Sequence, residues 1–317
     1  MYKNISLAKN TLPLIKDMIN NFEKFKINVL EVSKATIIDC GLTSQGSIIA
    51  GLSFTKIALG GLADVQLTLP LNGNNDRLMT VQVSTSFPTL ATLGCQAASW
   101  NVNIKDFSAM VCGPGRALAQ KPSKIYKLLN YKDESDIAIF CMEANQIPSE
   151  EVITYFAEKC AVKKENLILL VIKTNCLVEY IQMASRAIEI GVFKLVELLN
   201  FPFDQILHAV GLGIVSPITN DIDNSNDRVN NALIYGTKLF LVVQSTPRDN
   251  LDKLIKEIPS KSSSWYGQKF LNLFSRVNRD FSKFDLKLLA PSEIVVNDIR
   301  TGKIYQEGKI DLQFIKS

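Results

Sequence analysis

The hydrophobic positions at the start of the chain follow first the period of a helix and then that of strands. Residues 8–25 predict an amphipathic helix, because their apolar side chains recur at helical spacing: Leu14, Ile15, Met18, Ile19 and Phe22. Short apolar runs at 28–33 and 35–40 predict two strands. Residues 63–69 and 79–84 alternate as strands do, on either side of the turn dipeptide Asn72-Gly73.

From about residue 131 onward, strands and helices alternate. Buried strands at 136–142 and 166–172 are each followed by a helix, the first from Ser149 to about Lys159 and the second from 177 to 199. The alternation continues with strands at 208–215, 238–243, 292–299 and 303–306 and with helices at 226–234, 250–257 and 265–276. This order predicts an α/β fold. We expect two tightly packed subdomains within one unit of residues 1–317, roughly a β-rich part over 1–130 and an α/β part over 131–317 that carries Arg186 and Glu189. This division leaves open domains built from discontinuous segments.

Composition narrows the class of protein. The chain has 317 residues, of which 47% are hydrophobic and 21% charged, and its net charge is +4. These values are typical of a globular protein and give no sign of the clustered basic face of a nucleic-acid binder. The longest apolar run, Leu167–Ile172, is far short of the ~20 residues that span a bilayer. With no secretory signal in the first residues, we expect a cytoplasmic protein without a membrane partner.

Histidine and cysteine offer little for a metal site. The six cysteines are scattered without a C-x-x-C pair, so we interpret them as buried small hydrophobic residues. The single histidine, His208, lies in an apolar stretch, where a core or strand-end histidine is more common than a catalytic base. We therefore expect no bound metal and no bound cofactor, and acid–base chemistry carried out by carboxylates.

Clustered glycines mark four candidate ligand segments: Gly46–Gly51, Gly60-Gly61-Leu62, Gly113-Pro114-Gly115-Arg116 and Gly211-Leu212-Gly213. The last two lack the third glycine of the dinucleotide fingerprint, which argues against a nucleotide-binding fold of that type. Glycines allow backbone N–H groups to approach a ligand, and Arg116 adds a positive charge. Turns without any ligand explain each segment equally well.

The predicted helix over 177–199 carries the most suggestive pair. Arg186 and Glu189 are three residues apart and hence neighbours on a helix, among small and apolar side chains. An arginine beside a glutamate keeps the carboxylate ionised and oriented, as a general base requires. On spacing alone, a surface ion pair is the more common explanation.

Taken together, these segments resemble the methenyltetrahydromethanopterin cyclohydrolases over essentially the whole chain. The resemblance rests on the order and spacing of several short motifs: Ile38-Asp39-Cys40-Gly41, Gly60-Gly61-Leu62, Gly113–Ala117, the helix with Gln182, Arg186 and Glu189, Arg228 with Asn230 and Ile234-Tyr235-Gly236, and Thr301-Gly302-Lys303. Gly113–Arg116 and Leu273–Asn278 are more similar to bacterial, methylotroph-type members. That similarity implies formaldehyde oxidation as the metabolic context.

The resemblance implies a function and a site. Members hydrolyse 5,10-methenyltetrahydromethanopterin to the N5-formyl compound without a metal, as homotrimers, with the pterin in a cleft between two α/β domains. The family's catalytic arginine and glutamate match Arg186 and Glu189, which makes Glu189 the general base and Arg186 its assistant. For substrate binding the resemblance implies Gln182, Arg228, Arg116 and the glycines Gly60, Gly61, Gly113 and Gly115.

The chain departs from the family pattern at four positions. Ala97 replaces a larger polar residue, Ser99 a glycine, Asn231 an aspartate and Thr237 a second glycine. These changes leave room for a slower or specialised paralogue. Two alternatives to the enzyme stay open. One is an impaired relative that binds a reduced pterin, or serves a protein partner, without hydrolysis. The other is an α/β structural subunit in which Arg186 and Glu189 form only an ion pair.

Overall fold

The chain folds into two compact units, each built from two separate segments. A computed structural model describes residues 2, 4–69 and 78–315, so the expected Asn72-Gly73 turn lies outside the described residues. The first unit comprises Met1–Asp64 and Leu90–Gln182, and the second Val65–Thr89 and Met183–Ser317. The fold is mixed α/β, as predicted. The expected subdivision at residue 130 falls inside the first unit, because the strands near residues 63–85 belong to the second sheet.

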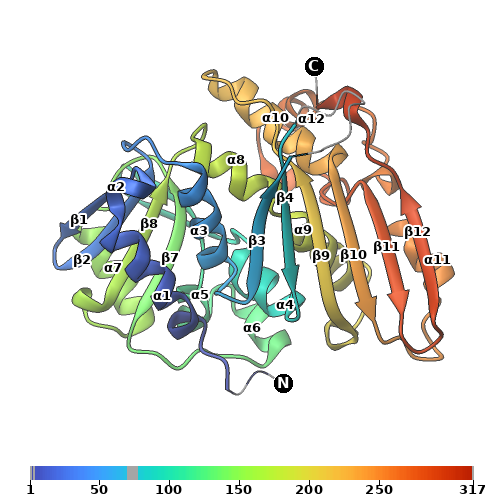
Figure 1. Cartoon of the computed structure of the whole chain (residues 1–317), viewed down its shortest axis with the longest axis horizontal. Coiled ribbons are helices and arrows are strands. Elements are labelled where there is room, and N and C mark those ends of the chain that lie inside the picture. Colours follow the sequence, from blue (N-terminus) through green and yellow to red (C-terminus); the bar gives the residue numbers. More distant parts are fainter. Residues whose placement is uncertain (1, 3, 70–77, 316–317) are drawn as a thin grey trace. The chain divides into compact units, whose positions relative to one another are not determined.

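The first unit contains a six-stranded sheet in the order β1-β2-β8-β7-β6-β5 (Figure 1). Its strands are β1 (Asn28–Val32), β2 (Ala35–Gly41), β5 (Trp100–Ile104), β6 (Phe107–Cys112), β7 (Ala138–Ala144) and β8 (Leu167–Ile172). The central strands β2, β8 and β7 are parallel, whereas β1, β6 and β5 are added antiparallel at the edges. The central strands are almost continuously apolar because both of their faces are buried.

Helices cover both faces of this first sheet. Helices α1 (Leu7–Asn20) and α3 (Ile48–Ala58) pack on one face through side chains such as Met18 and Phe54. Helix α7 (Glu150–Cys160) packs on the other face, where Phe156 contacts Phe140 of β7. The remaining helices of the unit are α2 (Phe22–Phe25), α5 (Gly115–Ala119) and α6 (Ser123–Leu129), together with a π-helical turn at Thr92–Gln96. Helices α4 (Pro88–Ala91) and α8 (Leu177–Ala184) each contain a boundary between segments of the two units.

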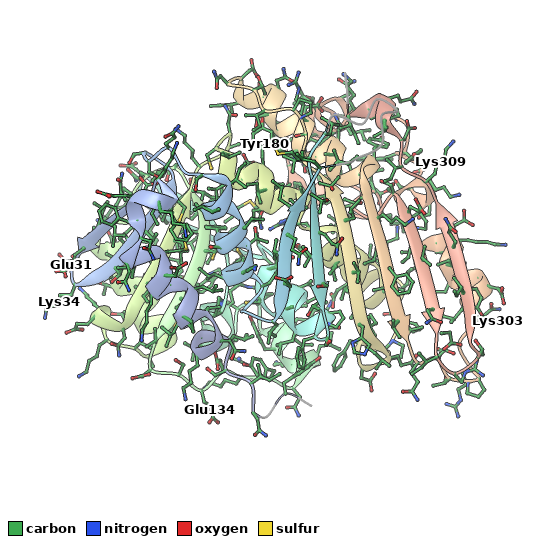
Figure 2. The ribbon with its side chains drawn as sticks, viewed as in Figure 1. Glu31, Lys34, Glu134, Tyr180, Lys303 and Lys309 are labelled. Atoms are coloured by element: carbon green, nitrogen blue, oxygen red, sulfur yellow. The ribbon has the colours of Figure 1, made fainter. Side chains whose placement is uncertain are left out.

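A tight turn fixes the register of β1 and β2. Val32 pairs with Ala35, so only Ser33 and Lys34 connect the strands, with φ values of 48° and 74°. Positive φ at both central residues is the geometry of the two-residue hairpin, whose twist matches that of the strands. Figure 2 shows Glu31 and Lys34 beside this turn.

The second unit contains a six-stranded sheet in the order β12-β11-β10-β9-β4-β3 (Figure 1). The strands are β3 (Ala63–Thr68), β4 (Thr80–Thr85), β9 (Ile206–Ile214), β10 (Thr237–Val243), β11 (Glu293–Asp298) and β12 (Lys303–Gly308). Strands β10 and β11 are parallel, and the pairs β4–β9, β9–β10 and β11–β12 are antiparallel. Lys303 and Lys309 mark the two ends of β12 in Figure 2.

The helices of the second unit include one clear departure from expectation. The predicted continuous helix over 177–199 is interrupted: α8 ends at Ala184, α9 (Ala187–Phe193) begins after two intervening residues, and a π-helical turn follows at Lys194–Leu198. The helices α10 (Ile222–Tyr235), α11 (Leu251–Glu257) and α12 (Phe270–Arg276) match predicted ones. Within the described ranges, we find no helix with the length and apolar character needed to traverse a lipid bilayer.

Candidate active site

Arg186 and Glu189 lie where the chain leaves α8 and starts α9. The N–H of Arg186 donates to Met183 O at 3.2 Å, which closes a short turn, and Arg186 O accepts the bond from Ile190 N at 3.0 Å that opens α9. The backbone of Arg186 has φ −85° and ψ 5°, in the sparsely populated bridge region where active-site residues recur. Arg186 is therefore the N-cap residue of α9 and Glu189 lies in its first turn.

The two side chains form a shielded ion pair. Arg186 Nη1 donates to Glu189 Oε1 at 3.4 Å, and the side chains are only 15% and 11% exposed. Exposed ion pairs are weak because water and salt screen them, whereas a pair removed from solvent interacts more strongly. A guanidinium in this position favours the ionised carboxylate. The pair thus differs from the surface ion pair that spacing alone would suggest, and it can present a carboxylate base to a bound molecule.

Arg116 lies in the interior of the first unit rather than on its surface. Its side chain is fully buried, and each of its five N–H groups is engaged. Nε donates to Lys121 O, while Nη1 and Nη2 donate to main-chain carbonyls at the end of the π-helical turn and to one hydroxyl: Cys95 O, Ala97 O, Leu93 O and Ser99 Oγ. A contact with substrate would have to replace at least one of these bonds. That predicted contact therefore stays a prediction, and the observed role of Arg116 is to hold this turn.

The predicted binding glycines all lie where a side chain would meet neighbouring atoms closely. Gly60 and Gly61 have φ near +69° and +66° and end α3, with their N–H groups bonded to Ile57 O and Lys56 O. Gly113 has φ +96°, and its N–H donates to Cys95 O. A Cβ on Gly115 would lie 2.4 Å from the Phe140 ring. Close packing explains why these four positions are glycines, and their contact with substrate stays a prediction.

Gln182 and Arg228 lie on different helices. Gln182 belongs to α8 and is buried, as is its neighbour Tyr180, labelled in Figure 2. Arg228 lies on α10, and its Nη1 donates to Pro217 O at 3.2 Å. Arg228 Nε is buried and has no hydrogen-bond partner among the residues that the structure describes. Arg228 therefore has an N–H group left to donate to a further acceptor, whereas all five N–H groups of Arg116 are engaged.

Three of the four departures from the family pattern have side chains that form hydrogen bonds inside the fold. Ser99 Oγ accepts from Arg116, Asn231 Oδ1 accepts from Phe270 N at 2.8 Å, and Thr237 Oγ1 donates to Leu233 O at 2.9 Å. Ala97 contributes only its main-chain carbonyl, which accepts from Arg116. None of these bonds involves the Arg186–Glu189 pair.

The structure buries charged residues whose role was not expected from the sequence, among them Lys194 and Asp39. Lys194 follows α9, and its Nζ donates to Lys287 O at 2.7 Å and to Ser262 Oγ at 3.1 Å. Burial lowers the pKa of Lys194 to about 8. The sequence feature that could have indicated this burial is the position of the lysine within the otherwise apolar run Val192–Val196.

The second is Asp39, at the end of β2. Its carboxylate accepts hydrogen bonds from the turn that follows, including Leu42 N at 2.7 Å and Ser44 N at 2.9 Å. Burial acts to raise the pKa of Asp39, but the hydrogen bonds from Thr43, Gly41, Leu42 and Ser44 outweigh it, so the pKa lies below its usual value. The motif around Asp39 was recognised, but its role in shaping the turn was not.

Metal-ligating side chains do not gather in the described ranges. Among those residues, no group of three His, Cys, Asp or Glu side chains could hold an ion. All six cysteines are buried and unbridged. His208 is exposed on β9, with Nδ1 3.1 Å from Ser86 Oγ, and so is a strand histidine rather than a core one.

The structure is that of an α/β protein with a shielded Arg–Glu pair at the start of α9. A family model described as "Cyclohydrolase (MCH)" matches residues 6–317, and the chain belongs to this family. Relatives named methenyltetrahydromethanopterin cyclohydrolase include those of Methanocaldococcus jannaschii and Methanococcus aeolicus, 39% and 40% identical over 98% of this chain and 97% of each relative. The relative of Methanothermobacter marburgensis is 36% identical over 98% of both chains. The expected family and the expected hydrolase class are confirmed.

Proposed function

We propose that this chain hydrolyses 5,10-methenyltetrahydromethanopterin to N5-formyltetrahydromethanopterin, with Glu189 as general base and Arg186 assisting. The names of its relatives support the reaction. The observation that carries the assignment of residues is the Arg186–Glu189 pair, held at 3.4 Å and largely shielded from solvent. Both residues also match the pattern from which the family resemblance was drawn.

The chemistry suits a carboxylate and requires no stronger base. The methenyl carbon belongs to a cationic amidinium and is already electrophilic, so water needs only to be positioned and partly deprotonated. Glu189 takes one proton as the water oxygen bonds to that carbon. The bond from the carbon to the departing nitrogen then breaks, and this nitrogen receives the proton from Glu189. The second water proton leaves for solvent as the formyl C=O forms.

Arg186 has two tasks in this scheme. Its positive charge keeps Glu189 ionised in a site that excludes most water, where an isolated carboxylate would tend to bind a proton. It also stabilises the oxygen on which negative charge develops during attack and collapse. Both tasks depend on the N-cap position of Arg186, which holds the guanidinium beside the first turn of α9.

For the anionic tail of the substrate we propose Arg228. The tail in this class of pterins carries phosphate and carboxylate groups, and a guanidinium binds both through charged hydrogen bonds. The buried, unpartnered Nε of Arg228 among the described residues supports this assignment over Arg116. Gln182, Gly60, Gly61, Gly113 and Gly115 stay candidate substrate contacts.

We also propose three further properties of the protein that accompany this reaction. The protein acts as a homotrimer, binds no metal or cofactor of its own, and serves formaldehyde oxidation. The last rests on Gly113–Arg116 and Leu273–Asn278 alone, since the relatives named above offer it no support. Sedimentation of the purified protein tests the trimer.

The deciding experiment follows the loss of methenyl absorbance with wild-type protein and Glu189→Gln, with pterin binding measured alongside. Glutamine keeps the size and reach of the side chain but removes its basicity. We expect turnover to fall by roughly 10²–10⁴ with little change in affinity. Binding without turnover in the wild type would instead identify an impaired paralogue, and no binding at all a structural subunit. Near-normal turnover of Glu189→Gln would place the base elsewhere.

A further inference from the structure

Helix α9 lies very close to the sheet of the second unit, at a contact made of glycines. A Cβ added to Gly213 of β9 would lie 2.0 Å from the carbonyl oxygen of Ala184. A Cβ added to Gly211 would lie 2.8 Å from Ile188 Cγ1 and 3.1 Å from Ala187 Cβ. Carbon atoms in contact are ordinarily separated by about 3.5–4.0 Å. Any side chain at either glycine would therefore separate the strand from the turn at 184–188.

The strand is the less movable partner in this contact. Gly211 pairs with Leu239 of β10 on one side and with Val83 of β4 on the other. Gly213 is held in the same way between β10 and β4. A strand that is hydrogen-bonded to a neighbouring strand on each side resists displacement. The turn between α8 and α9 lies outside the two helices and is held less firmly. An added methyl group would thus move the turn.

That turn carries the ion pair. Arg186 lies between Ala184, which contacts Gly213, and Ala187, which contacts Gly211. Glu189 directly follows Ile188, so it leaves α9 about 100° further round the helix than the side chain that touches the strand. A shift of the helix start relative to the sheet is passed on to both members of the pair.

We propose that Gly211 and Gly213 are positioning residues for the reaction. By lacking side chains, they set the distance between the 184–188 turn and the sheet, and so the location of Arg186 and Glu189 relative to bound substrate. This inference rests on the proposed function of Glu189. It gives the Gly211-x-Gly213 segment a role in catalysis, through the pair, in place of a nucleotide fingerprint or a plain turn.

The expected effect is large because catalytic geometry is sensitive to small shifts. Relieving a 2.8 Å contact requires a displacement of several tenths of an ångström, and misplacement by about 1 Å can cost roughly 10²-fold in rate. We expect Gly211→Ala to lower kcat by about 10-fold or more while KM changes less than about twofold. Val210→Ala, on the exposed face of the same strand, is the matched control and should keep normal kcat.

A rescue variant separates positioning from stability. Ile188→Ala removes the Cγ1 atom that an alanine at 211 would meet, at the cost of a cavity. The double variant Gly211→Ala/Ile188→Ala should therefore recover the kcat of Ile188→Ala although its melting temperature stays low. Ala187→Ser adds one atom to the same contact from the helix side and should lower kcat in the same way, which covers the case in which Gly211→Ala does not fold.

The decisive measurement is kcat of Gly211→Ala in the Glu189→Gln background. If Gly211 acts through Glu189, the second substitution should cause no further loss. Wild-type kcat in a folded Gly211→Ala or Ala187→Ser, no recovery in the double variant, or a full additional loss in the Glu189→Gln background would overturn the inference. Near-normal turnover of Glu189→Gln itself would instead overturn the proposed function, so the two failures are distinguishable.

Discussion

Arg186 Nη1 donates a hydrogen bond to Glu189 Oε1 across the break between α8 and α9. Because Arg186 caps α9 and Glu189 lies in its first turn, one local backbone conformation fixes both members of the pair. The two residues are thus neighbours on one short stretch of backbone. Its chemistry can be tested by changing either residue alone.

Removing the cation should lower the fraction of Glu189 that is ionised at neutral pH, while the carboxyl group itself stays in place. In Arg186→Ala, a shielded Glu189 without its partner binds a proton more readily, so the acidic limb of the rate profile should move to higher pH. The rate at neutral pH should fall by about 10-fold or more. In the Glu189→Gln background the same change should add little, since both act through one carboxylate. A pH–rate profile identical to that of the wild type would contradict this account.

Substitution of Arg116 should lower the stability of the fold rather than weaken substrate binding. Lysine cannot reproduce a planar group with five donors, so Arg116→Lys should leave several of the bonded carbonyls without a partner. We expect a loss of about 3 kcal/mol or more in the free energy of unfolding, measured with urea. In the fraction that folds, KM and its salt dependence should be unchanged. A raised KM at normal stability would restore the predicted substrate contact.

Arg228 should show the opposite behaviour. It already has a hydrogen bond to Pro217 O, but its Nε is available among the described residues, and we assign it to the anionic tail. Arg228→Ala should raise KM by about 10-fold with little change in kcat, and should flatten the dependence of KM on salt. Arg276→Ala, at the end of α12, serves as the control for the loss of one positive charge. Equal effects of the two variants on KM would rule out a specific contact.

Lys194 gives the unfolding equilibrium a distinct pH dependence. Its pKa in the folded protein is about 8 because of burial, below the value of 10.5 in the unfolded chain. The unfolded chain thus binds the proton more tightly, so stability rises as the pH increases from about 8 to 10.5. Relative to Lys194→Met, the wild type should gain about 1–2 kcal/mol between pH 7 and pH 9.5. Parallel urea titrations at the two pH values measure the gain, and a constant difference would contradict it.

Chelation should leave the activity intact. The chain offers one histidine and no C-x-x-C pair, so no zinc site of the usual sequence spacing can be drawn from it. Prolonged dialysis against EDTA should change turnover by less than about twofold, with metal content measured before and after. Stoichiometric metal in the active protein, with activity lost on its removal and regained on its return, would overturn the proposed mechanism.

Much of the fold could be predicted because it follows local hydrophobic pattern. The strands β7 and β8 and the helix α7 match the predicted segments closely, since continuous apolar runs and first-turn acidic residues are local signals. Helix α3 was missed. It is apolar over most of its length and packs beneath α1, so it lacks the polar face on which a periodic pattern depends.

The candidate site was only partly predictable, because part of it depends on contacts between residues that are distant in sequence. The pairing of Arg186 with Glu189 follows from their spacing, but the break before Arg186 does not, because the contact that it makes involves Gly213, which is distant in sequence. Arg116 was expected at a ligand because a glycine-rich segment precedes it. Its burial depends on carbonyl groups of the turn at residues 92–97, and no local sequence pattern predicts that turn.

The order of segments along the chain also governs how the protein can be made. Strand β4 ends at Thr85, but its ladder partner β9 begins at Ile206, about 120 residues later. At roughly 5–20 residues per second, a ribosome needs about 6–24 s to deliver that partner. Throughout this interval, Val81 and Val83, which are buried in the finished sheet, are exposed on an unpaired strand edge. The nascent chain is thus most vulnerable to aggregation in mid-synthesis, and slower translation should lower the yield of folded protein unless a chaperone covers β4.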